Sequence, residues 1–198
     1  TGTNNSFGYS VASGDVNGDG YSDVIVGAYG YPENTLSTSQ GRAYIFFGAS
    51  SMTTPDNSAD VVLENPTGTD RDGFGISVAS AGDVNGDGYS DVVVGAYAYI
   101  YSGSPNYRGR AYIYFGSSSM TSPDSSADVV LENPTATNSE YFGYSVASAG
   151  DVNGDGYING TDMYILSRHI QGFRNLSSDF LTAGNVDADI NGLINGTD

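Results

Sequence analysis

The stretch Asp83-Val84-Asn85-Gly86-Asp87-Gly88-Tyr89-Ser90-Asp91 decides the fold, because its first seven residues occur three times in the chain. The copies begin at Asp15, Asp83 and Asp151, so each starts 68 residues after the one before. Two flanking segments return at the same interval, 41–45 as 109–113 and 59–66 as 127–134. Self-similarity at a fixed period predicts stacked supersecondary units, each of which buries its apolar face only against a neighbour.

Each copy is arranged as a metal-binding loop. In the second copy, oxygen-bearing side chains stand at positions 1, 3, 5 and 9, and the carbonyl of position 7 can join them. Gly88 at position 6 permits a sharp left-handed turn. All-oxygen ligands in a flexible loop favour Ca²⁺ over Zn²⁺ and Mg²⁺. One such string alone is also compatible with a solvated turn, but the agreement between copies favours a metal site.

The residues around the second loop alternate between apolar and small or polar types, which predicts β-strands. The expected strands are 74–79, 92–97, 110–115 and 128–131. Four short strands in each period make one antiparallel blade. We therefore predict a mainly β protein in which residues 1–150 form two full blades and the first strand of a third.

This pattern resembles the FG-GAP repeat of integrin alpha subunits over about residues 5–157. The Phe-Gly element begins at Phe7, Phe74 and Phe142, whereas Tyr29 and Tyr97 stand where the family has proline. The resemblance implies four-stranded propeller-type blades with calcium loops between the first two strands of each blade. Carried over residue by residue, it implies these Ca²⁺ ligands: Asp15, Asn17, Asp19, the Tyr21 carbonyl and Asp23, and Asp83, Asn85, Asp87, the Tyr89 carbonyl and Asp91.

The third copy begins as a blade and then changes character. Apolar residues from Met163 to Phe173 recur at spacings of three and four, which predicts a helix, and a further loop begins at Asp187. Both loops have the EF-hand ligand pattern, with aspartate at position 12. The predicted ligands are Asp151, Asn153, Asp155, the Tyr157 carbonyl, Asn159 and Asp162, and then Asp187, Asp189, Asn191, the Leu193 carbonyl, Asn195 and Asp198.

This pair of loops resembles a type I dockerin, the module that binds cohesin domains in cellulosomes. Gly160-Thr161 and Gly196-Thr197 match at positions that face the cohesin in that family. The resemblance implies a small α segment with EF-hand-like loops at 151–198. We expect this segment to be truncated, because no exit helix follows Asp198.

Composition excludes several functions. The net charge is −17 with six Lys and Arg residues, which disfavours nucleic acid as a partner. The chain has no cysteine, so disulfides and cysteine-based metal sites are excluded. No apolar run reaches the roughly 20 residues needed to span a bilayer, so we expect no membrane insertion. Extracellular Ca²⁺ would fill even weak loops, so we predict an extracellular or cell-surface location.

An enzymatic role has little support in the sequence. The single histidine, His169, lies on the polar side of the predicted helix. A glycosidase pair would have to come from Glu33, Glu64, Glu132 and Glu140. Glu64 and Glu132 are equivalent strand-end residues, which we interpret as structural. We therefore predict a non-enzymatic protein and name no catalytic residue.

The predicted partners follow from the unclosed array. About four blades make the smallest propeller, so two blades leave open edges that other copies could pair with, as a ring or a fibre, unless further blades lie outside this segment. A calcium-stabilised structural or adhesive role follows. The alternatives are a cellulosome-type subunit that binds a cohesin, and a carbohydrate-binding module that uses the tyrosines of 97–108. Sequons at Asn4 and Asn175 are predicted glycosylation sites.

Overall fold

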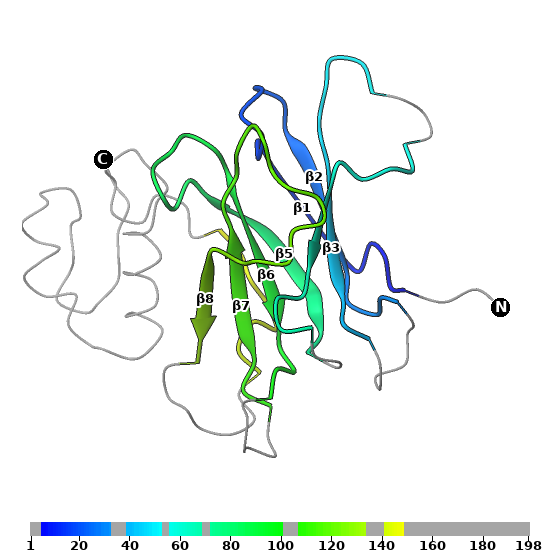
Figure 1. The fold of residues 1–198 in the computed structure, drawn as a ribbon, viewed down its shortest axis with the longest axis vertical. Helices are drawn as coiled ribbons and strands as arrows, with labels where there is room; N and C mark the ends of the chain where they lie inside the picture. The colour runs from blue at the N-terminus through cyan, green and yellow to red at the C-terminus, as the bar shows by residue number, and fades with distance from the viewer. Residues whose placement is uncertain are drawn as a thin grey trace, which may run out of the picture.

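The computed structural model describes residues 5–32, 39–52, 56–68, 72–100, 107–133 and 141–148. These residues form two four-stranded sheets in which consecutive strands pair antiparallel (Figure 1). We call them blade 1 and blade 2. Blade 1 contains β1 (Ser10–Gly14), β2 (Asp23–Ala28), β3 (Arg42–Phe46) and β4 (Val61–Glu64). Blade 2 contains β5 (Phe74–Gly82), β6 (Asp91–Ala96), β7 (Arg110–Tyr114) and β8 (Val129–Glu132).

The predicted four-stranded antiparallel sheets are confirmed, and the described residues contain no helix. The predicted helix and the two EF-hand-like loops of 151–198 lie outside the described residues. The expected opening strand of a third blade is wrong for residues 141–148, which form only an isolated bridge between Gly109 and Phe142. A first strand is held by the second strand of its own blade, and the described residues supply no such strand here.

The two blades have the same register, displaced by one repeat. Ile25 pairs with Ile45 and Ile45 with Val61 in blade 1, and blade 2 repeats this with its own three strands. The blades differ in the first strand, because β5 carries one residue more before the acidic loop. The extra residue is taken up by a register shift between Ser80 and Gly82, as a β-bulge does.

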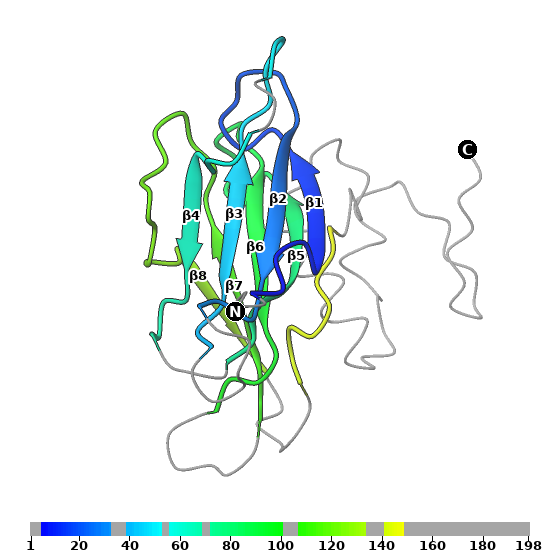
Figure 2. The same ribbon diagram turned by 90° about the vertical axis from the view of Figure 1, so that its right-hand side faces the viewer.

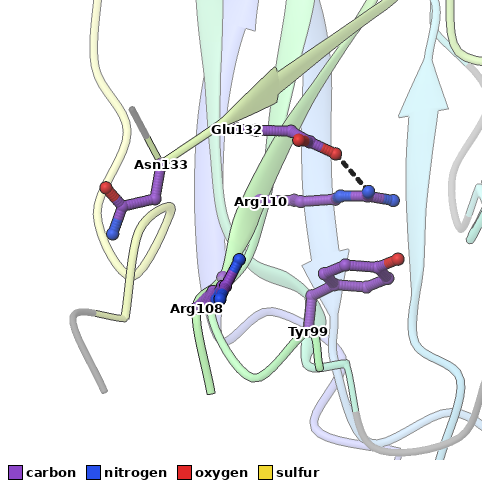
Figure 3. Close-up of a pocket in the computed structure, with 6 residues that line it drawn as sticks. Tyr99, Arg108, Arg110, Glu132 and Asn133 are labelled. Atoms are coloured by element: carbon purple, nitrogen blue, oxygen red, sulfur yellow. Dashed lines mark hydrogen bonds and ion pairs between the residues drawn. The ribbon is translucent and has the colours of Figure 1, made fainter. Parts of the chain in front are cut away.

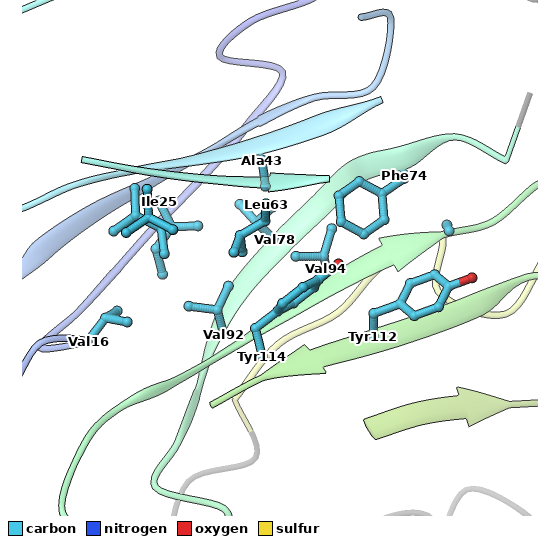
Figure 4. Packing of buried hydrophobic residues seen from close by; sticks show 13 residues of the cluster. Val16, Ile25, Ala43, Leu63, Phe74, Val78, Val92, Val94, Tyr112 and Tyr114 are labelled. Atoms are coloured by element: carbon cyan, nitrogen blue, oxygen red, sulfur yellow. The ribbon is translucent and has the colours of Figure 1, made fainter. Parts of the chain in front are cut away.

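The main core lies between the two sheets, which lie face to face in Figures 2 and 4. Blade 1 contributes Ile25, Ala43, Ile45, Val61 and Leu63, and blade 2 contributes Phe74, Val78, Val92, Val94, Tyr112 and Tyr114. The Tyr114 hydroxyl crosses this layer and donates to the Glu64 carbonyl oxygen at 2.8 Å. A smaller cluster covers the other face of blade 2, where Phe142 and Val146 pack against it.

The buried tyrosines of β7 predict a loss of stability at alkaline pH. Burial raises the pKa of Tyr112 to about 12, and burial also raises the pKa of Tyr114. Tyrosine in the unfolded chain titrates near pH 10. The folded state therefore favours the neutral form of both phenols. Their contribution to stability is complete below about pH 10 and is lost as pH rises toward 12.

We therefore expect the urea midpoint, followed by circular dichroism, to fall steadily above about pH 10. The variant Tyr112→Phe removes one of the titrating groups, so its midpoint should fall less steeply. A midpoint that is constant up to pH 11.5 would contradict this prediction.

Candidate calcium loops

The loop between β1 and β2 gathers the predicted ligand side chains of positions 1, 3 and 5. The backbone N–H of Asp19 donates to Asp15 Oδ1 at 3.1 Å and to Asn17 Oδ1 at 2.9 Å. The Asn17 amide donates to Asp19 Oδ2 at 3.0 Å. Three oxygen-bearing side chains therefore converge within one turn, although each is joined to the loop's own backbone or side chains.

The loop between β5 and β6 repeats this arrangement. The N–H of Asp87 donates to Asp83 Oδ1 at 3.0 Å and to Asn85 Oδ1 at 2.9 Å. The N–H of Gly88 donates to Asp83 Oδ2 at 2.8 Å, and Gly88 has a φ of +93°. This is the left-handed conformation that the glycine was expected to supply. The same geometry in both loops follows from their identical sequences.

The aspartate at position 9 points inward, away from the exposed part of the loop. Asp23 is fully buried, and its Oδ2 accepts the N–H of Val16 at 2.7 Å and of Asn17 at 3.3 Å. Its Oδ1 accepts the N–H of Gly48, just after β3, at 2.8 Å. Asp91 does the same, because Val84 N–H donates at 2.7 Å and Gly116 N–H at 2.9 Å. Each of these carboxylates therefore braces its own loop to the end of the third strand of the same blade.

The loop pattern predicted Asp23 and Asp91 only as ligands and did not indicate this bracing role. A signal was present in the sequence, since Gly48 and Gly116 recur with the same 68-residue interval as the aspartates. The interval alone does not say that the glycine N–H faces the carboxylate.

The buried carboxylates lie in an unfavourable electrostatic setting. Burial raises the pKa of Asp23 above its ordinary value, and the Asp19 carboxylate adds to the rise. The N–H donors of Gly48, Val16 and Asn17 oppose it. Burial likewise raises the pKa of Asp91, the N–H groups of Gly116 and Val84 oppose it, and the Asp87 and Asp83 carboxylates add to it. A nearby cation would favour the ionised form of each group.

Both loops contain ligands that Ca²⁺ accepts. Among the described residues, no three His, Cys, Asp or Glu side chains form a ready-made metal cluster. The loops instead combine carboxylates with asparagine and carbonyl oxygens, which are also Ca²⁺ ligands. A carboxylate has about four acceptor sites, and Asp23 uses three of them for N–H groups. One site on its Oδ1 stays available, so the residues present fit the ion.

Other candidate residues are engaged in structural contacts. Arg110 pairs with Glu132 and lies over the Tyr99 ring at 3.6 Å, in a pocket completed by Arg108, Gly109 and Asn133 (Figure 3). Arg42, Glu64 and Tyr31 form the equivalent group in blade 1. Glu64 and Glu132 thus pair with arginines of the adjacent strands, in agreement with the structural interpretation. Glu33, Glu140, His169, Asn4 and Asn175 lie outside the described residues.

The tyrosine-rich segment packs largely on its own blade and on the start of the third repeat. Tyr99 lies against Arg110 of β7, and the Tyr97 ring contacts the rings of Tyr141 and Tyr144 at 6.0 and 5.4 Å. Tyr107 lies 6.1 Å from Tyr141 and is 37% exposed. Of the described tyrosines in this segment, Tyr107 therefore has the surface that an external ligand could reach most readily.

Two protein families match this chain in different regions. The FG-GAP repeat family matches residues 7–46 and 74–114, which include the first three strands and the acidic loop of each blade. The dockerin type I domain family matches residues 149–198. FG-GAP repeats and a dockerin type I domain are therefore both found in this protein. No helix in the described part of the chain has the length and apolarity required to span a membrane.

Integrin alpha subunits are similar to this chain over the FG-GAP region. Integrin alpha-IIb of Mus musculus is 40% identical over 158 residues, which cover 76% of this chain and 14% of the integrin. Integrin alpha-PS3 of Drosophila melanogaster is 34% identical over 155 residues, which cover 76% of this chain and 13% of that integrin. Integrin alpha-6 of Gallus gallus is 35% identical over 152 residues, which cover 77% of this chain and 13% of that integrin. The chain thus spans 13–14% of the length of these relatives.

Proposed function

We propose that this protein is a non-enzymatic structural or adhesive protein of the cell surface or extracellular space, and that Ca²⁺ stabilises its blades. The observation that carries the proposal is the repeated blade, in which the same acidic loop is braced to the sheet by a buried aspartate. FG-GAP repeats and dockerins are non-catalytic modules, and both are typical of extracellular proteins. We propose a domain boundary at 150/151, close to residue 149, where the dockerin match begins.

Ca²⁺ is the proposed ion in all four loops, with the ligands named from the sequence. In the described loops, Asp15, Asn17 and Asp19 would bind it in the first, and Asp83, Asn85 and Asp87 in the second. The Tyr21 and Tyr89 carbonyls, with Asp23 and Asp91, would complete the two sets. A bound ion would offset the mutual repulsion of these carboxylates, so binding and folding are linked.

Calcium titration tests this proposal. We expect isothermal titration calorimetry of the whole chain to show four binding events, and two fewer after Asp15→Asn with Asp83→Asn. At a free Ca²⁺ concentration 100 times the Kd, each site should add about 2.7 kcal/mol to the free energy of unfolding. The control Asp60→Asn changes a carboxylate outside the loops, which accepts the Phe47 N–H. Unchanged binding in the double variant would refute the assignment of the two blade loops.

Self-assembly is the proposed mode of action. Two blades leave large apolar side chains on the open side of blade 1, among them Phe7, Val11 and Val24, which are 58%, 66% and 41% exposed. An apolar sheet face of this kind favours association. Light scattering over a range of concentrations should show a rising mass for the whole chain. A constant monomer mass would remove self-assembly and leave the calcium-stabilised module.

A second candidate function is attachment to a cohesin, which the dockerin match favours. The proposed contact residues are Thr161 and Thr197, at matching positions of the two dockerin-like loops. We expect a purified type I cohesin to bind the chain in Ca²⁺ and to lose affinity after Thr161→Asp with Thr197→Asp. Blade variants such as Asp60→Asn should bind normally. Failure of several cohesins to bind would remove this candidate.

Glycan binding by the tyrosine-rich segment is a weaker alternative, tested with Tyr107→Ala.

A further inference from the structure

The junction between the two blades includes a strand edge as well as the core. The connection from β7 to β8 lies along β4, where Asp124 N–H donates to the Val62 carbonyl at 2.8 Å and Glu64 N–H donates to the Asp124 carbonyl at 2.7 Å. Leu63 and Asp124 form a parallel bridge. Blade 2 therefore extends an arm that pairs with the outer edge of blade 1.

The two ends of the pair of blades carry the matching halves of another such junction. Asp56 is the counterpart of Asp124, one repeat earlier, and it is exposed. β8 is the counterpart of β4 and ends the strand order of blade 2, with Val130 46% exposed. The edge of blade 2 therefore has the sequence of the edge that is already paired inside the molecule, because 127–134 is identical to 59–66. The arm of blade 1 has a similar sequence to the arm of blade 2, and Pro-Asp at 55–56 repeats Pro-Asp at 123–124.

The sheet faces at the two ends match in the same way. Phe7, Val11 and Val24 are 58%, 66% and 41% exposed. Their counterparts in blade 2, Phe74, Val78 and Val92, are 0%, 6% and 0% exposed because blade 1 covers them. The receiving residues Val61 and Leu63 are fully covered, and their counterparts Val129 and Leu131 are only partly buried.

One segment occupies part of the receiving face. Phe142 and Val146 pack on blade 2 as Phe74 and Val78 pack on blade 1. The Ser77 hydroxyl donates to the Gly143 carbonyl at 2.9 Å, which repeats the bond from Ser10 to Gly75 at 3.2 Å. An incoming blade would have to place Phe7 and Val11 where this segment lies, so the segment has to move aside.

We propose that blade 1 of one copy docks on blade 2 of a second copy in the geometry of the internal junction, with Asp56 paired beside Leu131 on β8. The inference rests on the self-assembly proposed above and adds its interface and register. The second copy is the occupant because it carries the residues that the internal junction already uses. The contact is head-to-tail, so it repeats from copy to copy.

Engineered disulfides test the register, because the natural chain has no cysteine. Asp56→Cys with Leu131→Cys places two thiols at counterparts of the bridged pair Leu63 and Asp124. Neighbouring strands lie about 4.8 Å apart, within the Cα separation of roughly 4.4–6.8 Å that a disulfide needs. Under oxidation we expect a ladder of covalent dimers, trimers and longer species on a non-reducing gel.

Three variants of the whole chain serve as controls. Leu63→Cys with Asp124→Cys should give an internal disulfide and no ladder. Asp60→Cys with Leu131→Cys is out of register and should give little ladder. Asp56→Cys with Val130→Cys shifts the pair by one residue and places the second thiol on the opposite face of β8, so it should give less ladder than the matched pair. Phe142→Ser weakens the hold of the displaced segment, so it should increase the ladder in the first variant; an unchanged yield would overturn the displacement step.

The outcomes separate this inference from the function on which it rests. A ladder in the matched pair, Asp56→Cys with Leu131→Cys, and not in the out-of-register pairs supports the register. Association by light scattering without a ladder in the matched pair overturns the register and leaves self-assembly standing. A constant monomer mass without a ladder overturns both, and assigns the open face of blade 1 to a different blade or partner.

Discussion

The substitution Gly27→Ala is expected to separate the packed blades and to cost about 3 kcal/mol of unfolding free energy, at the upper end of the usual cost of overpacking. An added Cβ at Gly27 would lie 2.2 Å from the Gly75 carbonyl oxygen and 2.3 Å from the Ser10 hydroxyl. The first contact is with backbone in the opposite sheet, so a rotamer change cannot relieve it. The core between the sheets would have to open, and Tyr114 would move from the Glu64 carbonyl, to which it donates at 2.8 Å.

Urea unfolding followed by circular dichroism measures this effect, and Gly95→Ala is its matched control. The added Cβ at Gly95 would lie 1.9 Å from the Gly143 carbonyl oxygen, so the local clash is at least as severe. However, Gly143 belongs to the short segment 141–148 and not to a complete sheet. We expect that segment to shift, with a loss below about 1.5 kcal/mol. Equal losses for the two variants would mean that this segment is held as firmly as a blade.

The repeat made much of the fold predictable. Four apolar stretches in one period indicated four strands, and the structure places them at nearly the expected residues, with β6 at 91–96 where 92–97 was expected. The acidic loop between the first two strands was also predictable, because Gly88 and the alternating Asp and Asn residues define a tight turn by themselves. Features of this kind depend on neighbours in sequence.

Contacts between distant segments could not be predicted in the same way. The arm of blade 2 pairs with β4 through Asp124 and Val62, whose sequences carry no mark of that contact. The third repeat shows the converse error: Phe142-Gly143 matches the start of a blade, but the described residues form no strand there. A strand needs a partner, and local sequence does not report whether one is present.

Asp23→Ala is expected to destabilise the protein strongly even in a calcium chelator, whereas Asp15→Ala is not. Asp23 is fully buried and accepts three backbone N–H groups, from Val16, Asn17 and Gly48. Hydrogen bonds to a charged group contribute about 1.5–3 kcal/mol each. Removing the carboxylate also removes the cost of burying it, which is the main cause of its raised pKa. We therefore expect a net loss of about 3 kcal/mol in chelator.

Asp15 is the contrasting ligand in the same loop. Its carboxylate accepts the N–H groups of Asp19 and Gly20 in exposed bonds, so its loss should cost about 1 kcal/mol in chelator. In Ca²⁺ both variants should lose the stabilisation that the ion gives to this loop. Thermal unfolding of each variant, with and without Ca²⁺, separates the two roles. Equal stability of the two variants in chelator would show that Asp23 does not brace the blade. A full calcium response in Asp15→Ala would remove Asp15 from the ligand set.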